Sequence, residues 1–308
     1  MKHFISIADT SLTELRQILR RAVKLREEKQ RGLRNDPVLE GKTLALIFEK
    51  PSLRTKVSFQ QAIIELGGHS IVLGAEVGLN QRETVHDIIL VLEGMVHGVV
   101  ARVFEHQKLL DMARFGHIPV INALSDFLHP CQAMADALTW WDEFGEDLKG
   151  KTLAYIGDAN NVARSLAILT GKLEMNYVIA SPRGYQIEPD FIKDFLSEGR
   201  RSEFRMVSDP RDAVPGADIV YTDIWASMGM EREREIRREA FRGYQVNDDL
   251  LRLAPPHAIV MHCLPAARNL EITDDVKYGG QSRIFRQAHN RLHIQKGLLA
   301  FLFDSNAA

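Results

Sequence analysis

The chain has 308 residues, of which 45% are apolar and 26% are charged, and its formal net charge is −2. This length suits two domains of ordinary size, and the balanced charge does not indicate a nucleic-acid-binding surface. The sequence lacks the run of roughly 20 apolar residues that spans a bilayer and shows no signal peptide, so we expect a cytoplasmic protein without membrane partners. The two cysteines, Cys131 and Cys263, are too few for a disulfide framework and show no metal-ligand spacing.

Helical and strand-like patterns alternate along the first part of the chain. Residues 12–29 carry an apolar repeat of helical period behind the capping residues Asp9-Thr10-Ser11. The strands predicted after this helix are 43–48, 69–73, 98–104 and 119–122. The helices predicted between and after them are 51–66, 84–95, 108–115 and 130–144. Such alternation indicates a parallel sheet with helices on its faces.

A second run of the same kind follows a polar stretch at residues 145–151. Its predicted strands are 152–156, 177–180, 219–222 and 258–261, and its predicted helices are 161–173, 191–199 and 282–303. Residues 231–242 form a dense run of both charges, which predicts a solvated helix or loop. The fold class predicted is therefore α/β with two domains, each a parallel β-sheet with helices on both faces.

Polar clusters follow six of the predicted strands at the point where each strand ends. The clusters are 49–55, Arg102, 129–132, 158–161, 223–229 and 262–265. In open parallel sheets, ligands bind outside the carboxyl ends of the strands. The coincidence of six clusters predicts an active site in the cleft between the two domains.

The sharpest cluster is Ser52-Leu53-Arg54-Thr55, at the predicted start of a helix. A helix N-terminus offers unpaired N–H groups and a positive dipole end, to which this segment adds two hydroxyls and an arginine. These groups suit a phosphate, although an ordinary serine cap beside a surface arginine is the alternative. The glycine-rich P-loop motif is absent.

The other clusters each have a functional and a plain structural interpretation. Arg102 ends an apolar strand and either faces the cleft or snorkels at a sheet edge. His129 can donate to a carbonyl oxygen, and Gln132 can bind an amide, or both can be structural. Asp223 can pair with an ammonium group or begin an Asx turn. Cys263 is either a nucleophile or a buried inert thiol.

These clusters, in this order, resemble the aspartate/ornithine carbamoyltransferase superfamily, and within it the ornithine branch. FEKPSLRTKVSF is similar to the family's carbamoyl-phosphate loop, usually written S-T-R-T, and HPCQ is similar to its second carbamoyl-phosphate motif. GDANNVARSL, DIWASMG and HCLP resemble its ornithine-side motifs, and HNRLHIQKGLLAFL resembles its terminal helix. The resemblance covers essentially the whole chain.

The resemblance implies a domain and a role for each candidate residue. Residues 1–134 with 286–308 would bind carbamoyl phosphate, and residues 135–285 would bind ornithine. The implied carbamoyl-phosphate set is Ser52, Leu53, Arg54, Thr55, Arg102, His129, Gln132, Cys263, Leu264 and Arg291. The implied ornithine set is Asn161, Asp223, Ser227 and Met228, with Asn160 as the alternative to its neighbour. Thr55, Arg102, His129 and Cys263 would be the catalytic residues.

The implied reaction moves the carbamoyl group from carbamoyl phosphate to the δ-amine of ornithine, without a metal or organic cofactor. The implied assembly is a homotrimer. Two positions depart from the family pattern: Leu53 replaces a threonine, and Gly78 stands where a glutamine usually contacts carbamoyl phosphate. The alternatives are a carbamoyltransferase for another amine or an N-acylated ornithine, and a non-catalytic ligand-binding relative. A nicotinamide-dependent oxidoreductase is disfavoured because GxGxxG is missing after the strand at 152–156.

Overall fold

The computed structural model describes residues 3–196, 202–226 and 231–304. The chain forms two compact units, Met1–Leu138 with His289–Ala308, and Thr139–Ala288. We call these the first and second unit. The divisions between the units fall inside two helices, α5 (Pro130–Phe144) and α12 (Ile284–Phe303).

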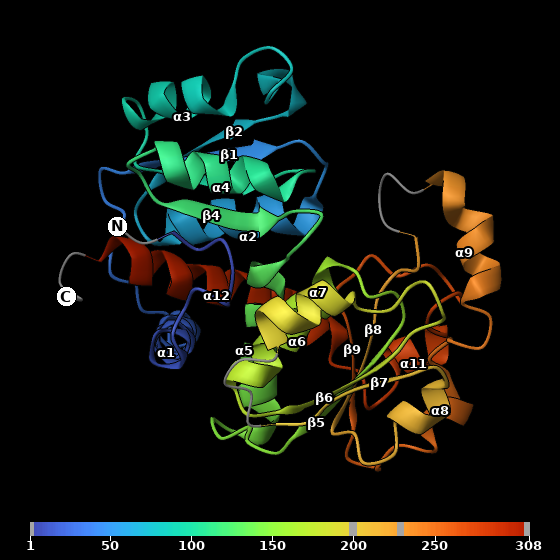
Figure 1. The fold of residues 1–308 in the computed structure, drawn as a ribbon. Coiled ribbons are helices and arrows are strands. Elements are labelled where there is room, and N and C mark those ends of the chain that lie inside the picture. Colours follow the sequence, from blue (N-terminus) through green and yellow to red (C-terminus); the bar gives the residue numbers. More distant parts are fainter. Residues whose placement is uncertain (1–2, 197–201, 227–230, 305–308) are drawn as a thin grey trace. The chain divides into compact units, whose positions relative to one another are not determined.

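The first unit is built on a four-stranded parallel sheet of order β2-β1-β3-β4 (Figure 1). Its strands are β1 (Thr43–Phe48), β2 (His69–Leu73), β3 (Gly98–Arg102) and β4 (Val120–Leu124). The helices of this part of the chain are α1 (Leu12–Gln30), α2 (Leu53–Glu65), the short η1 (Ala75–Val77), α3 (Val85–Glu93) and α4 (His106–Phe115). β1 and β3 are almost wholly buried, because helices cover the sheet.

The second unit is built on a five-stranded parallel sheet of order β7-β6-β5-β8-β9 (Figure 1). Its strands are β5 (Thr152–Ile156), β6 (Asn176–Ala180), β7 (Phe204–Val207), β8 (Ile219–Thr222) and β9 (Ile259–His262). The helical segments are α6 (Asn161–Lys172), α7 (Pro189–Phe191), η2 (Ile192–Leu196), α8 (Pro210–Ala213), η3 (Glu231–Glu233), α9 (Arg234–Ala240), α10 (Asp248–Leu251) and α11 (Asp274–Tyr278). Both units have the predicted fold class of parallel sheets with helices.

Side-chain caps explain where several helices begin. Ser11 and Glu14 form a reciprocal capping box at the start of α1. Thr84 caps α3, and Asn160 accepts hydrogen bonds from two backbone N–H groups at the start of α6. The predicted helix starts at residues 12 and 161 are therefore confirmed.

Several predicted boundaries were wrong. The strand predicted at 98–104 ends at Arg102, because a bulge interrupts the ladder there and the N–H of Phe104 donates to the Glu49 carboxylate instead. The helix predicted at 191–199 begins at Pro189 as α7 and continues as a π-helical turn to Leu196, and residues 197–199 lie outside the described part. The four-residue β7 and α8 were not predicted, because neither is long enough to show a clear hydrophobic period.

Within the described residues, we find no helix that combines the length and the apolar character needed to span a membrane.

Candidate active site

The loop that follows β1 leads directly into α2. Ser52 is the N-cap of this helix, and its Oγ accepts a hydrogen bond from the backbone N–H of Thr55 at 3.3 Å. Leu53, the first helical residue, has a side chain that is 76% exposed, so only its backbone can take part in a site. The carboxyl end of β1 therefore presents a helix N-terminus with Ser52, Arg54 and Thr55, which is the predicted anion-binding arrangement.

Buried polar side chains connect this loop to α5 and α12 within the first unit. Arg291 donates from Nη2 to Thr55 Oγ1 at 3.2 Å and from Nη1 to Gln132 Oε1 at 2.7 Å. Gln132 in turn donates to Asp136 Oδ1 at 2.9 Å. Thr55, Gln132 and Arg291 are each at most 2% exposed. The structure thus brings together three predicted residues from distant parts of the chain.

His129 lies among three arginines of the same unit. Burial lowers its pKa well below the usual value, and the charges of Arg291, Arg102 and Arg54 lower it further. The imidazole is therefore neutral at physiological pH and offers one donor and one acceptor nitrogen. Three guanidinium groups around one neutral histidine make this end of the first unit strongly suited to an anion.

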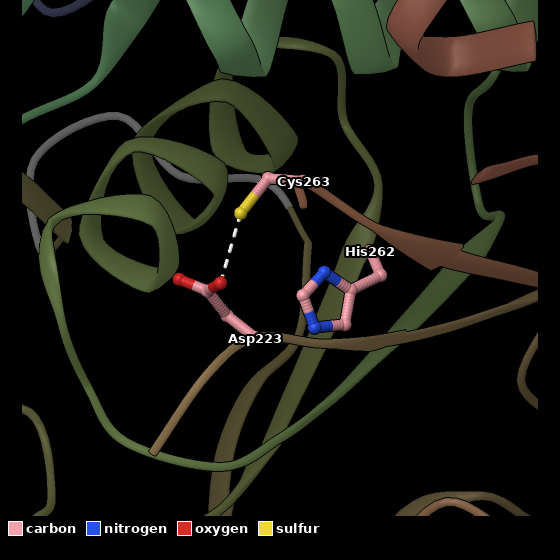
Figure 2. A group of neighbouring side chains, drawn as sticks. All are labelled: Asp223, His262 and Cys263. Carbon is pink, nitrogen blue, oxygen red and sulfur yellow. Dashed lines mark hydrogen bonds between the residues drawn. The ribbon is translucent and has the colours of Figure 1, made fainter. Parts of the chain in front are cut away.

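In the second unit, Asp223 follows β8 and receives three hydrogen bonds. Its Oδ1 accepts from the Cys263 thiol at 2.9 Å and from the N–H of Ile224 at 2.8 Å. Its Oδ2 accepts from Asn160 Nδ2 at 2.7 Å. Figure 2 shows the Cys263 thiol directed at this carboxylate. The arrangement holds a buried carboxylate and a thiol side by side at the carboxyl ends of β8 and β9.

The two adjacent asparagines have different positions. Asn160 is occupied locally, because its Oδ1 accepts from the N–H groups of Val162 and Ala163 while its Nδ2 donates to Asp223. Asn161 is the first residue of α6 and is half-buried. Asn160 therefore connects the start of α6 to the Asp223 carboxylate.

Asp223, His262 and Cys263 carry potential metal-ligand atoms that all lie within 4.8 Å of one another. His262 is nevertheless engaged at both ring nitrogens (Figure 2 shows its ring beside Asp223). Its Nδ1 accepts from the Leu264 N–H at 2.8 Å, so the proton is on Nε2, which donates to the fully buried Glu271 at 3.0 Å. His262 therefore orients the following loop, and the donor set left for an ion would be one carboxylate and one thiol.

The loop after β9 has an unusual backbone. Leu264 adopts a left-handed φ of 58° and precedes a cis peptide bond to Pro265. The His262 contact to the Leu264 N–H holds this conformation, which is uncommon for a non-glycine residue. The predicted contacts Ser227 and Met228 lie outside the described residues.

Comparison with known proteins matches both parts of the chain to one family. Residues 2–142 match the aspartate/ornithine carbamoyltransferase, carbamoyl-P binding domain, and residues 149–302 match the Asp/Orn binding domain of the same family. The chain belongs to the aspartate/ornithine carbamoyltransferase family. The resemblance predicted from the sequence motifs is confirmed.

Individual family members are similar over most or all of the chain. The ornithine carbamoyltransferase of Archaeoglobus fulgidus is 46% identical, with 100% of this chain and 99% of that protein covered. The anabolic ornithine carbamoyltransferase of Pyrococcus furiosus is 48% identical over 86% of this chain and 85% of that protein. The solved structure of ornithine carbamoyltransferase from Pyrococcus furiosus superposes with a TM-score of 0.95 at 44% identity, covering 99% and 97% of the two chains.

Gly78, one of the two departures from the family pattern, is explained by the backbone. It ends the short helix η1 with a left-handed φ of 64°, and a Cβ at this position would lie 3.0 Å from the Cβ of Arg82. A glutamine here would have to adopt this left-handed conformation and displace the Arg82 side chain slightly, so the local backbone favours glycine.

One buried contact beside the loop after β5 was not predicted from the sequence. Arg237, in the segment predicted to be solvated, is only 7% exposed and donates to Asp158 Oδ2 at 2.7 Å. The interpretation of 231–242 as wholly solvated was wrong at this residue, because its partner Asp158 is 79 residues away in the sequence. The only local signal was the position of Asp158 directly after a buried strand.

Proposed function

We propose that this chain is an ornithine carbamoyltransferase, which transfers the carbamoyl group of carbamoyl phosphate to the δ-amine of L-ornithine and releases citrulline and phosphate. The observation that carries the proposal is the buried contact of Arg291 with both Gln132 and Thr55 at the N-terminus of α2. The charges of Arg291, Arg102 and Arg54 also lower the pKa of His129, which adds to its lowering by burial. The family membership and the names of the similar proteins support the same reaction.

The first unit would hold carbamoyl phosphate. The N–H groups of the first turn of α2, the Ser52 and Thr55 hydroxyls and the guanidinium groups of Arg54 and Arg102 match a phosphate dianion. Thr55 Oγ1 already accepts from Arg291, so its own O–H can donate to the ligand. His129 and Gln132 would bind the carbamoyl end.

The second unit would hold ornithine. Asp223 would pair with the α-ammonium, and Asn161 with Ser227 and Met228 would bind the rest of the amino-acid part. Cys263 and Leu264 would line the reacting centre. The Cys263 thiol donates to Asp223, and we interpret it as a group that orients the amine, so no covalent enzyme intermediate is needed.

The chemistry would depend on position and charge. The deprotonated δ-amine attacks the carbonyl carbon, and negative charge grows on the carbonyl oxygen. Thr55, Arg102 and His129 would donate to this oxygen, and loss of one such donor typically costs about 3–4 kcal/mol in the barrier. The C–O bond to phosphate then breaks, and the departing phosphate can take up the amine proton.

A citrulline assay with carbamoyl phosphate and ornithine tests the assignment. We expect Arg54→Ala and Arg102→Ala to lower turnover by orders of magnitude, because each removes a charged donor from the phosphate or the growing oxyanion. Arg114→Ala, which removes an exposed arginine from α4, should leave turnover unchanged. Near-normal turnover in both Arg54→Ala and Arg102→Ala would contradict the proposed function.

A panel of ornithine, N-acetylornithine, putrescine and aspartate separates the proposed substrate from its rivals. The DIWASMG segment favours free ornithine. Turnover with another amine alone would replace the substrate assignment, and binding without turnover would indicate a non-catalytic relative.

We further propose that the enzyme works in the cytoplasm, in arginine biosynthesis, as a homotrimer. The similar protein of Pyrococcus furiosus carries the name anabolic, which supports the biosynthetic direction. Exposed apolar side chains on α2 support contact with further copies of the chain: Leu53, Val57 and Ile64 are 76%, 56% and 61% exposed.

A further inference from the structure

A buried ion pair lies directly beside the loop that begins α2. Glu49 is the first residue after β1, and its Oε1 lies 2.8 Å from the Nζ of Lys108. Its Oε2 accepts from the N–H of Phe104 at 2.8 Å, and its own N–H donates to the Arg102 carbonyl at 2.9 Å. The two charged side chains are 10% and 5% exposed. Glu49 thus connects the loop before Ser52 to the segment that follows Arg102.

The position of the Lys108 ammonium group is unfavourable without the carboxylate of Glu49 beside it. Lys108 is the third residue of α4, so its ammonium lies at the positive end of the helix dipole, and it is also buried. The helix does not require a cation there. Besides Glu49, its only other recorded ion-pair partner among the described residues is Glu105, at 3.5 Å. The location is understandable if the function of Lys108 is to hold and neutralise Glu49.

Glu49 would otherwise oppose the proposed ligand. It stands three residues before Ser52, where a free carboxylate would repel a phosphate dianion. Lys108 and the Phe104 N–H engage one oxygen each, which directs the carboxylate toward α4. Lys50, whose ammonium lies 4.2 Å from the centre of the Phe104 ring, adds a positive charge on the same loop.

We propose that Lys108 is a positioning and charge-balancing residue for carbamoyl phosphate. By holding Glu49, it fixes the position of the Ser52 loop relative to Arg102 and neutralises the carboxylate that would repel the phosphate. The inference rests on the proposed function. Lys108 acts through its ion pair with Glu49.

The test compares Michaelis constants for the two substrates in the purified full-length enzyme. In Lys108→Met, which keeps the apolar stem, we expect KM for carbamoyl phosphate to rise about tenfold or more, as when a charge-assisted contact is lost. KM for ornithine should change less than about twofold. Arg114→Met removes one positive charge from the far end of the same helix and should leave both constants unchanged.

A double variant separates positioning and charge from simple structural damage. Glu49→Gln combined with Lys108→Met removes the repulsive charge and leaves an amide that can still accept from Phe104, so KM for carbamoyl phosphate should return toward the wild-type value. Lys108→Arg should stay close to wild type. If Lys108→Met does not yield soluble protein, the double variant is compared with Glu49→Gln alone. Equal KM values for carbamoyl phosphate in these two variants support the proposal, because Lys108 should matter only while Glu49 is charged.

An unchanged KM for carbamoyl phosphate in Lys108→Met would overturn the inference. So would an equal rise of KM for carbamoyl phosphate and for ornithine in that variant. A KM for carbamoyl phosphate that is higher in the double variant than in Lys108→Met would overturn it as well. Failure of the wild-type enzyme to form citrulline would instead contradict the proposed function. In that case, the affinity for inorganic phosphate is measured by calorimetry for the wild type and for Lys108→Met. Weaker binding by Lys108→Met would support the role of Lys108, and equal affinities would overturn it.

Discussion

Arg237 joins the loops that follow β5 and β8. Its Nη1 donates to Asp158 at 2.7 Å and to the Trp225 carbonyl at 3.0 Å, and its guanidinium lies 4.9 Å from the centre of the Tyr185 ring. Asp158 stands two residues before Asn160, and Trp225 stands two residues after Asp223. One buried guanidinium therefore holds both flanks of the Asn160–Asp223 contact. Burial raises the pKa of Asp158, and the neighbouring charge of Arg237 opposes that rise.

We expect Arg237→Gln to raise KM for ornithine about tenfold and to leave KM for carbamoyl phosphate unchanged, because the change frees the loops around Asp223 only. It also leaves Asp158 without this charge partner, a loss that typically costs about 3–5 kcal/mol of stability when the pair is buried. Steady-state kinetics and thermal unfolding measure the two effects. Arg238→Gln, at the exposed neighbouring position, is the control, and identical behaviour of the two variants would contradict this role.

Among the elements, α1, α2 and α12 meet at a buried polar network in the first unit. The Nζ of Lys296 on α12 donates to Glu65 at 2.8 Å, to Asn35 at 2.7 Å and to the Leu25 carbonyl at 3.3 Å. Burial opposes ionisation of Glu65, but hydrogen bonds from Lys29, Lys296 and Gln61 outweigh it and lower its pKa to about 2. The lysine has three donors and uses all of them, so this buried charge is fully satisfied.

His293 on the same helix predicts a pH dependence of stability. Burial, and then the charges of Lys296, Arg26 and Lys29, lower its pKa to about 4 from 6.5. Between these values the unfolded chain binds a proton that the folded protein does not, so stability falls as the pH drops from about 6.5 to about 4. The contribution of this one site is at most about 1.4 kcal/mol per pH unit.

The measurement is urea unfolding at steps between pH 7 and pH 4 (about the range set by the two pKa values). His293→Gln should show a shallower decline than the wild type. Glu65 contributes its own loss of stability only below about pH 4.5, the value from which its pKa is lowered, so it does not obscure the upper part of the range. Parallel curves for the two proteins would show that His293 is not the group responsible.

At the scale of the whole molecule, the solvent-facing side of α2 predicts self-association. Val57 and Ile64 are two helical turns apart on one face and are more than half exposed. Burial of such side chains against another copy would stabilise an oligomer by roughly 25 cal/mol for each Å² of apolar surface removed from water.

We therefore expect Val57→Asp with Ile64→Asp to shift the enzyme from the proposed trimer toward monomers, which sedimentation velocity measures directly. Gln17→Asp, a charge added at an exposed position of α1, should leave the assembly intact. A monomeric wild-type protein, or a double variant that remains trimeric, would contradict the proposed use of this face.

The sequence by itself determined the elements whose signals are local. The strands at 43–48, 69–73, 152–156 and 219–222 have the bounds that their apolar runs predict. Ser11, Ser52 and Thr84 cap helices because a short polar side chain needs only the next turn of backbone as its partner. The polar clusters after the strands at 43–48, 152–156 and 219–222 followed from the same local patterns, and the family motifs then supplied their expected roles.

Only the tertiary structure decided the contacts between distant segments. The ion pair of Glu49 with Lys108 spans 59 residues of sequence, and that of Asp158 with Arg237 spans 79. The sequence around Lys108 and around Arg237 does not indicate that these side chains are buried. The hydrogen bond from Asn160 to Asp223 likewise joins residues that are 63 positions apart in the sequence. A charged side chain is exposed by default, and it becomes buried only where the folded chain brings a partner of opposite charge to it.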